Sequence, residues 1–243
     1  MLAMTALFLV ALVAGALGGV IGTGSSLVLL PVLVVSYGPR VAVPVMAVAA
    51  VMANVGRVAA WWREIRWRPV LAYAGPGTPA AVAGAHTLMT ISQSTVENVL
   101  GIFFLVVIPL RRLAAARNWR IRLWQMAVAG VIIGFLTGLV LSTGPLSVPV
   151  FTGWGLSGGA FLGSEAASAL VLYAAKMGTF GELGALSPAV LVRGLVIGSA
   201  LMVGPFLAKP LVRRIRPEAF GLLIDAVLAT AAVGMFVATH AAA

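Results

Sequence analysis

The segments Gly22-Thr23-Gly24-Ser25-Ser26 and Ser142-Thr143-Gly144-Pro145 decide the expected fold, because each interrupts a long apolar stretch. Paired interruptions at corresponding positions in two halves are typical of membrane transporters, where a broken helix leaves backbone groups free to hold a solute. We therefore expect the function to reside at these two turns.

The composition is that of an integral membrane protein. Hydrophobic residues make up 61% of the 243 residues and charged residues only 9%. Long stretches rich in Gly, Ala and Leu predict helices rather than a barrel. The segment 1–22 has no Lys or Arg before its apolar run and leads into more membrane sequence, so we expect a first helix rather than a signal peptide.

Metal, disulfide and cofactor chemistry has little support in the sequence. The chain has no cysteine and only two histidines, His86 and His240, which are far apart. No phosphate-binding loop of the glycine-lysine type occurs. We expect no metal, no cofactor and no enzymatic activity.

Eight segments are near the ~20 residues that a bilayer-spanning helix requires, and two apolar segments are shorter. The long segments are 3–21, 41–61, 70–88, 96–110, 123–142, 160–178, 188–208 and 218–239. The short ones, 25–36 and 145–156, follow the two glycine turns. Pro69, Pro188 and Pro217 suit first-turn positions, and Ser94-Thr95-Val96-Glu97 reads as a capping box.

The net charge of +10 is concentrated in short connections, which predicts their cytoplasmic location rather than nucleic-acid binding. The bases are Arg63, Arg66 and Arg68, then Arg111, Arg112, Arg117, Arg120 and Arg122, then Lys209, Arg213, Arg214 and Arg216. Trp61, Trp62, Trp67, Trp119 and Trp124 flank them and read as an aromatic belt at that interface. The expected location is the cytoplasmic (inner) membrane, with multiple passes.

With the basic connections inside, helix 41–61 runs inward whereas 160–178 runs outward. Corresponding helices then point in opposite directions, provided that the short segments count as crossings or deep half-helices. The prediction is an all-α inverted repeat of about five plus five segments in one transport domain. It divides into a first repeat at 1–112, a basic cytoplasmic loop at 113–122 and a second repeat at 123–243.

Similar residues at corresponding positions of the two halves support the repeat. Gly19 pairs with Gly138, Asn54 with Lys176, and Gly75-Pro76 with Gly204-Pro205. A small-residue stripe also precedes each break. Its members, to which we assign helix packing, are Ala11, Gly15 and Gly19 in one helix and Gly130, Gly134 and Gly138 in the other.

The first break also carries a family resemblance. Residues Gly18-Gly19-Val20-Ile21-Gly22-Thr23-Gly24, followed by an apolar run into Pro31, resemble the signature of the TauE/SafE sulfite exporter family, and the glycine turn is repeated between Gly138 and Pro149. The resemblance implies transport of small sulfur-containing or carboxylate anions across the cytoplasmic membrane. The chain departs from the pattern at Ser25, Ser26 and Pro145, where family members tend to continue with glycine.

The residues themselves favour an anion. Short helices that begin near Ser25 and Pro145 would present unpaired N–H groups and positive dipole ends near mid-membrane. The alternative is that the hydroxyls only cap helix ends. The candidate substrate-binding residues are Thr23, Gly24, Ser25, Ser26, Asn54, Ser142, Thr143, Gly144 and Lys176.

Charged side chains inside apolar segments are costly and therefore functional candidates. Lys176 could approach the anion or extend to the interface. For Arg57, a role in transport and a position set by the loop topology are equally good explanations. Glu165, placed in the first turn of its helix, and Asp225 are the candidates for coupling, although a first-turn carboxylate can simply complement the helix dipole. His86 reads as an interfacial residue.

We expect a secondary transporter, an exporter by resemblance, of a small sulfur oxyanion or organosulfonate such as sulfite, thiosulfate or sulfoacetate. Its partners are the anion and the lipid bilayer. The alternatives are a passive anion channel, a transporter of a non-sulfur carboxylate, an intramembrane enzyme, or a membrane partner that does not transport. The sequence does not specify the exact anion, the direction, the coupling ion or the oligomeric state.

Overall fold

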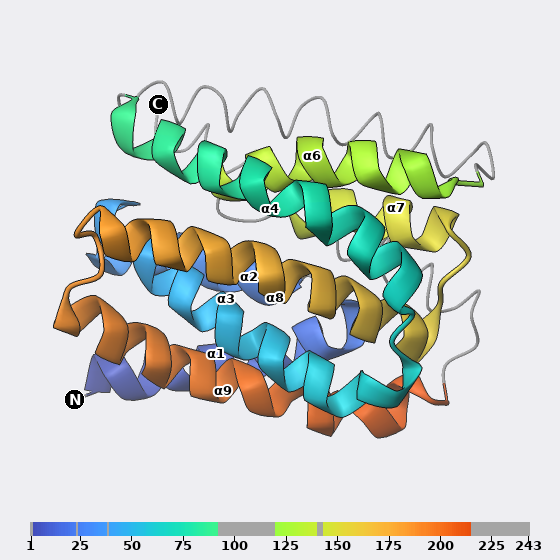
Figure 1. Cartoon of the computed structure of the whole chain (residues 1–243). Helices are drawn as coiled ribbons and strands as arrows, with labels where there is room; N and C mark the ends of the chain where they lie inside the picture. Colours follow the sequence, from blue (N-terminus) through green and yellow to red (C-terminus); the bar gives the residue numbers. More distant parts are fainter. Residues whose placement is uncertain (1, 23, 38, 92–119, 140–142, 215–243) are drawn as a thin grey trace, which may run out of the picture.

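The computed structural model describes residues 2–22, 24–37, 39–91, 120–139 and 143–214 (Figure 1). These residues form helices and no strand. The helices are α1 (Leu2–Ile21), α2 (Gly24–Tyr37), α3 (Pro39–Trp61), η1 (Trp62–Glu64), α4 (Trp67–Thr90), α6 (Leu123–Leu139), α7 (Gly144–Gly153), α8 (Gly158–Glu182) and α9 (Pro188–Val212).

The all-helical prediction is confirmed for these residues, and the helix bounds lie close to those expected. The segments after the two breaks are short, as expected: α2 has 14 residues and α7 has 10. Pro188 opens α9, where the Ser187 hydroxyl accepts from the Val190 N–H at 3.3 Å. The expected helices 96–110 and 218–239, the capping box at 94–97 and Pro217 lie outside the described residues.

Several described helices suit a bilayer. Three stretches are long and apolar enough to cross it, Val41–Glu64, Gly158–Glu182 and Pro188–Val212, and the shorter apolar stretches Phe8–Val20 and Leu123–Leu139 accompany them. Large apolar side chains face outward, among them Leu9, Val13 and Leu17 of α1 and Leu195, Phe206 and Leu207 of α9. An apolar outer surface is what contact with lipid requires, and the chain is a multi-pass membrane protein.

The two small-residue stripes pack helices closely, as predicted. In α6, Gly130 lies against the backbone of Tyr73 in α4, and Gly134 lies against Gly77. The residue numbers of the contacting pairs increase together along both helices, so the two helices run parallel. In the same way Gly15 and Gly19 of α1 lie against Leu201 and Pro205 of α9, and this pair is also parallel. A Cβ on these glycines would meet backbone atoms.

Two of the predicted residue pairings between the halves are wrong. Asn54 donates to the Ala50 carbonyl of its own helix, whereas Lys176, its expected counterpart, donates to the Thr137 carbonyl of α6. Gly204, which precedes Pro205, packs against the α1 backbone, whereas a Cβ on Gly75 would meet nothing within 4 Å. The two Gly-Pro pairs therefore do not occupy equivalent contacts.

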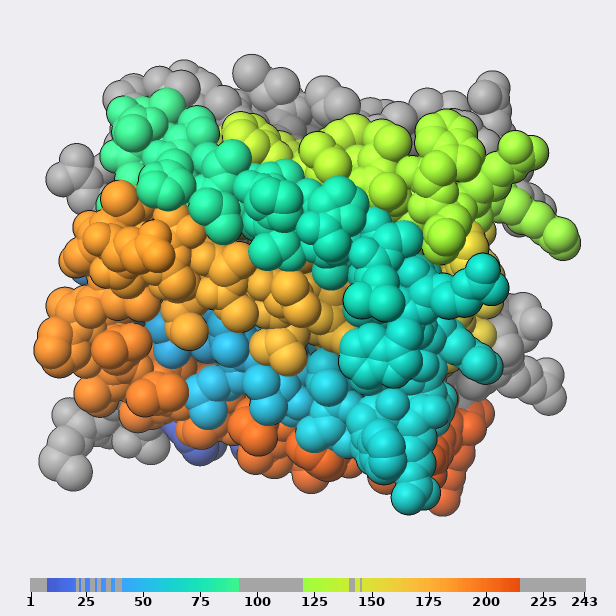
Figure 2. All heavy atoms as spheres, in the orientation of Figure 1, coloured from blue at the N-terminus to red at the C-terminus, as the bar shows by residue number. Residues whose placement is uncertain are grey.

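The helices form two blocks that meet along α3 and α8 (Figure 1). The first block contains α1, α2, α3 and α9, and the second contains α4, α6, α7 and α8. Each block thus combines helices from both halves of the chain. On the face drawn in Figure 2, side chains of α3, α4 and α8 form a continuous surface.

Eight of the described basic residues gather at one end of the bundle, at the right in Figure 1, which we call the basic end. Arg193, which lies over the Tyr37 ring near the start of α9, is not among them. Its arginines and lysine are Arg63, Arg66, Arg68, Arg120, Arg122, Lys209, Arg213 and Arg214. Arg213 lies 4.0 Å from Glu64, and the Ile121 N–H donates to the Gly153 carbonyl at 2.9 Å. The connections of both halves therefore meet there.

The expected tryptophan belt is only partly correct. Trp62, Trp67 and Trp124 are exposed at the basic end, but Trp61 is buried, with the Lys209 ammonium 5.2 Å from its ring centroid. Trp61 faces inward because α9 and α8 cover the end of α3, and Gly159 of α8 lies against its ring. Trp119 lies outside the described residues.

Candidate functional site

The first break lies at the end of α1. Gly22 has a left-handed backbone conformation, with φ of 90°, which glycine adopts without strain. Its N–H still donates to the Gly18 carbonyl at 2.8 Å. Its own carbonyl accepts a hydrogen bond from the Arg57 guanidinium of α3. The chain then turns into α2, which begins at Gly24 and carries Ser25 and Ser26 in its first turn.

The second break lies between α6 and α7. Thr143 precedes α7, but its side chain makes no capping hydrogen bond to that helix. Its hydroxyl lies 2.5 Å from that of Thr137, in the last turn of α6. Both residues are buried. For Thr143, the capping alternative is therefore wrong.

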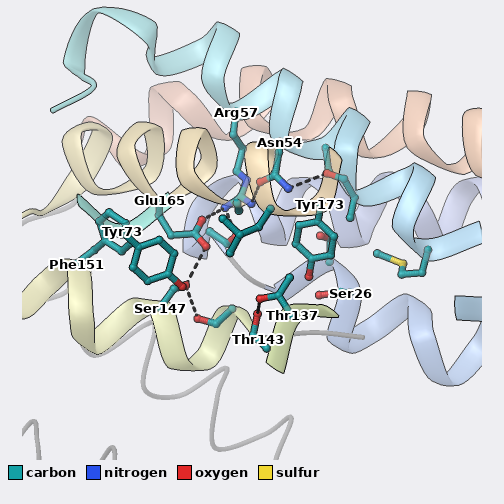
Figure 3. Close-up of a pocket in the computed structure, with 18 residues that line it drawn as sticks. Ser26, Asn54, Arg57, Tyr73, Thr137, Thr143, Ser147, Phe151, Glu165 and Tyr173 are labelled. Carbon is teal, nitrogen blue, oxygen red and sulfur yellow. Dashed lines mark hydrogen bonds and ion pairs between the residues drawn. The ribbon is translucent and has the colours of Figure 1, made fainter. Parts of the chain in front are cut away.

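The two breaks line one cavity of about 40 Å³ (Figure 3). The first contributes Gly22, Ser25 and Ser26, and the second contributes Thr143 and Gly144. A water molecule needs about 10–15 Å³ by this measure of volume, so the space suits a few waters or one small oxyanion. The remaining wall comes from α3, α4, α6, α7 and α8.

A buried ion pair crosses the cavity wall between the two blocks. Arg57 Nη1 lies 2.7 Å from Glu165 Oε2, and both side chains are at most 10% exposed. The other guanidinium nitrogen, Nη2, donates to the Asn54 amide oxygen, and Asn54 Nδ2 donates to the Ala50 carbonyl at 2.8 Å. Such a pair is stable in an apolar interior only when the remaining polar atoms are also hydrogen-bonded.

Glu165 lies deeper than its expected place. We expected it in the first turn of a helix beginning near residue 160, but α8 begins at Gly158 and Glu165 is the eighth residue. Complementing the helix dipole therefore does not explain it. Its second carboxylate oxygen accepts from the Ser147 hydroxyl of α7 at 2.9 Å.

Lys176 is fully buried, so the alternative that it extends to the interface is wrong. Its ammonium donates to the Thr137 carbonyl at 2.8 Å and lies 5.4 Å from the Phe180 ring centroid. It is not among the residues that line the cavity. It contacts the end of α6, next to the second break.

The structure brings most of the described candidates together. Of the predicted residues, Ser25, Ser26, Asn54, Thr143, Gly144 and Glu165 line the cavity. Gly24 opens α2 beside them. Thr23, Ser142 and Asp225 lie outside the described residues. His86 is exposed near the end of α4, as expected for an interfacial residue.

Four polar lining residues were not predicted from the sequence, namely Tyr73, Thr137, Ser147 and Tyr173. For Arg57, the sequence did not distinguish a role in transport from that of a positive charge near the cytoplasmic loop. Ser147 was accessible to prediction, because it lies one helical turn after Thr143 and so shares its face. The contact between Arg57 and Glu165 could not be predicted, because 108 residues separate them in the sequence.

A family model described as "Sulfite exporter TauE/SafE" matches residues 7–235. The chain belongs to the TauE/SafE sulfite exporter family. The TauE/SafE match includes both breaks and the whole cavity lining, and it confirms the resemblance seen around Gly18–Gly24. Searches of curated proteins and of solved structures gave no match. Among the described residues, no group of His, Cys, Asp or Glu could hold a metal ion.

Proposed function

We propose that this TauE/SafE member is a secondary transporter, acting as an exporter, of a small sulfur oxyanion or organosulfonate such as sulfite, thiosulfate or sulfoacetate. The observation that carries the proposal is that both helix breaks and the guanidinium of Arg57 line one small buried cavity. The family description supports sulfite as the first anion to test.

The chemistry of the cavity favours an anion with several oxygens. The N-terminal turn of α2 provides backbone N–H groups and a positive dipole end. The first turn of α7 provides its dipole end and the Gly144 N–H, because Pro145 has no N–H and the next two N–H groups donate to the Thr143 carbonyl. Hydroxyl groups of Ser25, Ser26 and Thr143 line the cavity, and Arg57 contributes a full positive charge. The proposed substrate contacts also include Thr23, Gly24, Asn54, Ser142 and Gly144, with Lys176 holding the second break in place.

We also propose that the two halves, 1–112 and 123–243, form an inverted repeat joined by the loop 113–122. Two regularities support it. The cavity residues Ala50, Ala53 and Asn54 of α3 are each 119 residues before the cavity residues Ala169, Leu172 and Tyr173 of α8. The first helix of each half also runs parallel to the fourth segment of the other half.

Alternating access would then follow from rocking of the two blocks along the contact between α3 and α8, around an anion held at the breaks. The basic end faces the cytoplasm in this proposal, in accordance with the excess of arginine in its connections. The membrane is the cytoplasmic (inner) membrane. An ATP-driven step and an enzymatic reaction form no part of the mechanism.

Transport into proteoliposomes tests the proposal. We expect saturable uptake of radiolabelled sulfite, competition by thiosulfate or sulfoacetate, and faster uptake when the liposomes are preloaded with unlabelled anion. Preloading separates a carrier from a passive channel, because a channel does not exchange one anion for another. Folded, inserted protein that gives no uptake above empty liposomes would overturn the proposal.

A further inference from the structure

We propose that the transported anion and Glu165 compete for Arg57, and that one proton binds to Glu165 with each anion. The inference rests on the proposed function and specifies how the same site couples anion binding to protons. It arises from the geometry of the ion pair, which lies in the wall of the cavity that would receive the anion.

Both N–H groups of Arg57 Nη1 are already engaged. Nη1 donates to Glu165 Oε2 at 2.7 Å and to the Gly22 carbonyl, and Nη2 donates to Asn54. An oxyanion that binds at Nη1 must take the place of one of its two acceptors, the Gly22 carbonyl or Glu165. The Gly22 carbonyl and Asn54 belong to the same block as Arg57, whereas Glu165 belongs to the other block. Glu165 is therefore the acceptor that can move away.

The charges of the cavity lead to the same conclusion. Among its described lining residues, Arg57 and Glu165 are the charged ones, and they balance each other. An anion adds negative charge to a buried space in which Arg57 can no longer neutralise both it and Glu165. A proton on the carboxylate removes one unit of that excess charge. The protonated carboxyl group keeps a partner, because it can donate to the Ser147 hydroxyl that now donates to it at 2.9 Å.

The described charged and titratable groups that face Glu165 come from α3, α4 and its own helix α8. Arg57 faces it from α3 and retains its charge at all relevant pH values. Tyr73 of α4 and Tyr173 of α8 also lie close enough to interact with its charge, and phenols are neutral in this range. The cavity residues from α2, α6 and α7 carry hydroxyl groups or apolar side chains. Lys176, on its own helix, contacts Thr137 instead.

The decisive measurement uses the unmodified protein in detergent. Thiosulfate suits it, because this anion is the base of a strong acid and keeps its charge near neutral pH. We expect the affinity for thiosulfate to rise as the pH falls, by up to about tenfold per pH unit. In weak buffer with a pH indicator, we expect uptake of one proton for each thiosulfate bound. Sulfite is measured in parallel and corrected for its own titration.

The variant Glu165→Gln removes the titrating group and keeps its shape. We expect it to bind thiosulfate at pH 8 as tightly as the parent protein does at low pH, with no remaining pH dependence. Glu182→Gln is the matched control, since Glu182 is exposed at the end of the same helix, and it should behave like the parent protein. If Glu165→Gln does not fold, the proton count in the parent protein decides alone.

The outcomes separate the two proposals. Saturable anion binding without proton uptake and without pH dependence would overturn the competition with Glu165 and leave the transporter proposal standing. The same holds if Glu165→Gln folds and keeps the pH dependence of the parent protein. Folded protein that binds neither thiosulfate nor sulfite at any pH would overturn the proposed function itself.

Discussion

Lys176 lies 119 residues after Arg57, and each of these cations donates to a backbone carbonyl at the end of the first helix of its own half. Arg57 donates to Gly22 after α1, and Lys176 donates to Thr137 in the last turn of α6 at 2.8 Å. Cations at such carbonyls compensate for the missing helical hydrogen bonds and the negative dipole end. Arg57 differs from Lys176 in that it also lines the cavity and pairs with Glu165.

Replacing Arg57 by Gln should abolish thiosulfate binding and destabilise the protein. The variant leaves the Glu165 carboxylate buried without its cation, which costs about 3–5 kcal/mol. The double variant Arg57→Gln/Glu165→Gln should regain most of the thermal stability and still not bind the anion. Thermal unfolding in detergent and an equilibrium binding assay measure the two effects separately. Wild-type affinity in the double variant would exclude Arg57 as the anion contact.

Removing the hydroxyls at both breaks should weaken anion binding more than it weakens the fold. For Ser25→Ala combined with Thr143→Ala, we expect the affinity for sulfite to fall by at least tenfold, since a hydrogen bond to a charged group contributes about 1.5–3 kcal/mol. Ser199→Ala, on the exposed side of α9, is the control. Unchanged sulfite affinity would leave these hydroxyls with structural roles alone.

A variant of Lys176 distinguishes a positioning role for this residue from direct contact with the anion. Its ammonium is buried against the Thr137 carbonyl and does not line the cavity. We expect Lys176→Gln to lower the unfolding temperature while reducing thiosulfate affinity far less than Arg57→Gln does. A loss of affinity as large as that of Arg57→Gln, in folded protein, would instead assign Lys176 to the anion.

The parallel packing of α4 and α6 should not tolerate a single added methyl group. In Gly134→Ala the new Cβ would lie 2.8 Å from the Gly77 Cα, and overpacking of this kind costs about 1–3 kcal/mol. Gly75→Ala in α4 is the matched control, because its Cβ would meet nothing within 4 Å. The unfolding temperature should fall for Gly134→Ala and stay level or rise for Gly75→Ala; equal effects would contradict the packing.

The absence of native cysteine allows a direct test of topology. Single cysteines at Ser157 and Gly181 would mark the two exposed ends of α8. In intact cells, a membrane-impermeant maleimide should label position 181 and should label position 157 only after permeabilisation. The reverse pattern would contradict a cytoplasmic basic end.

Most of the helical framework followed from the sequence because it depends on local signals. Apolar length located α3, α8 and α9, and the glycine turns located the short helices α2 and α7. The stripe of Gly130, Gly134 and Gly138 predicted a helix contact, though not that α4 would be the partner. Helix partners depend on contacts between distant segments, and a single sequence does not record them.

The cavity was predicted in part, and for the same reason. Ser25, Asn54 and Thr143 were identified by their type and by their nearness to the breaks. The partner of Arg57 was not identified, because Glu165 comes from another helix and was expected too close to the N-terminus of that helix. The burial of Trp61 likewise depends on α8 and α9, which follow it by about a hundred residues or more.

The packing of α1 against α9 has a consequence for how the protein is made. These two helices are parallel neighbours through Gly15 and Gly19, yet nearly the whole described chain separates them. At a synthesis rate of about 5–20 residues per second, α1 enters the bilayer roughly 10–40 s before its partner exists. During that interval its row of glycines faces lipid or the insertion machinery. Assembly is therefore completed only when α9 leaves the ribosome, and neither half of the chain can complete a block alone.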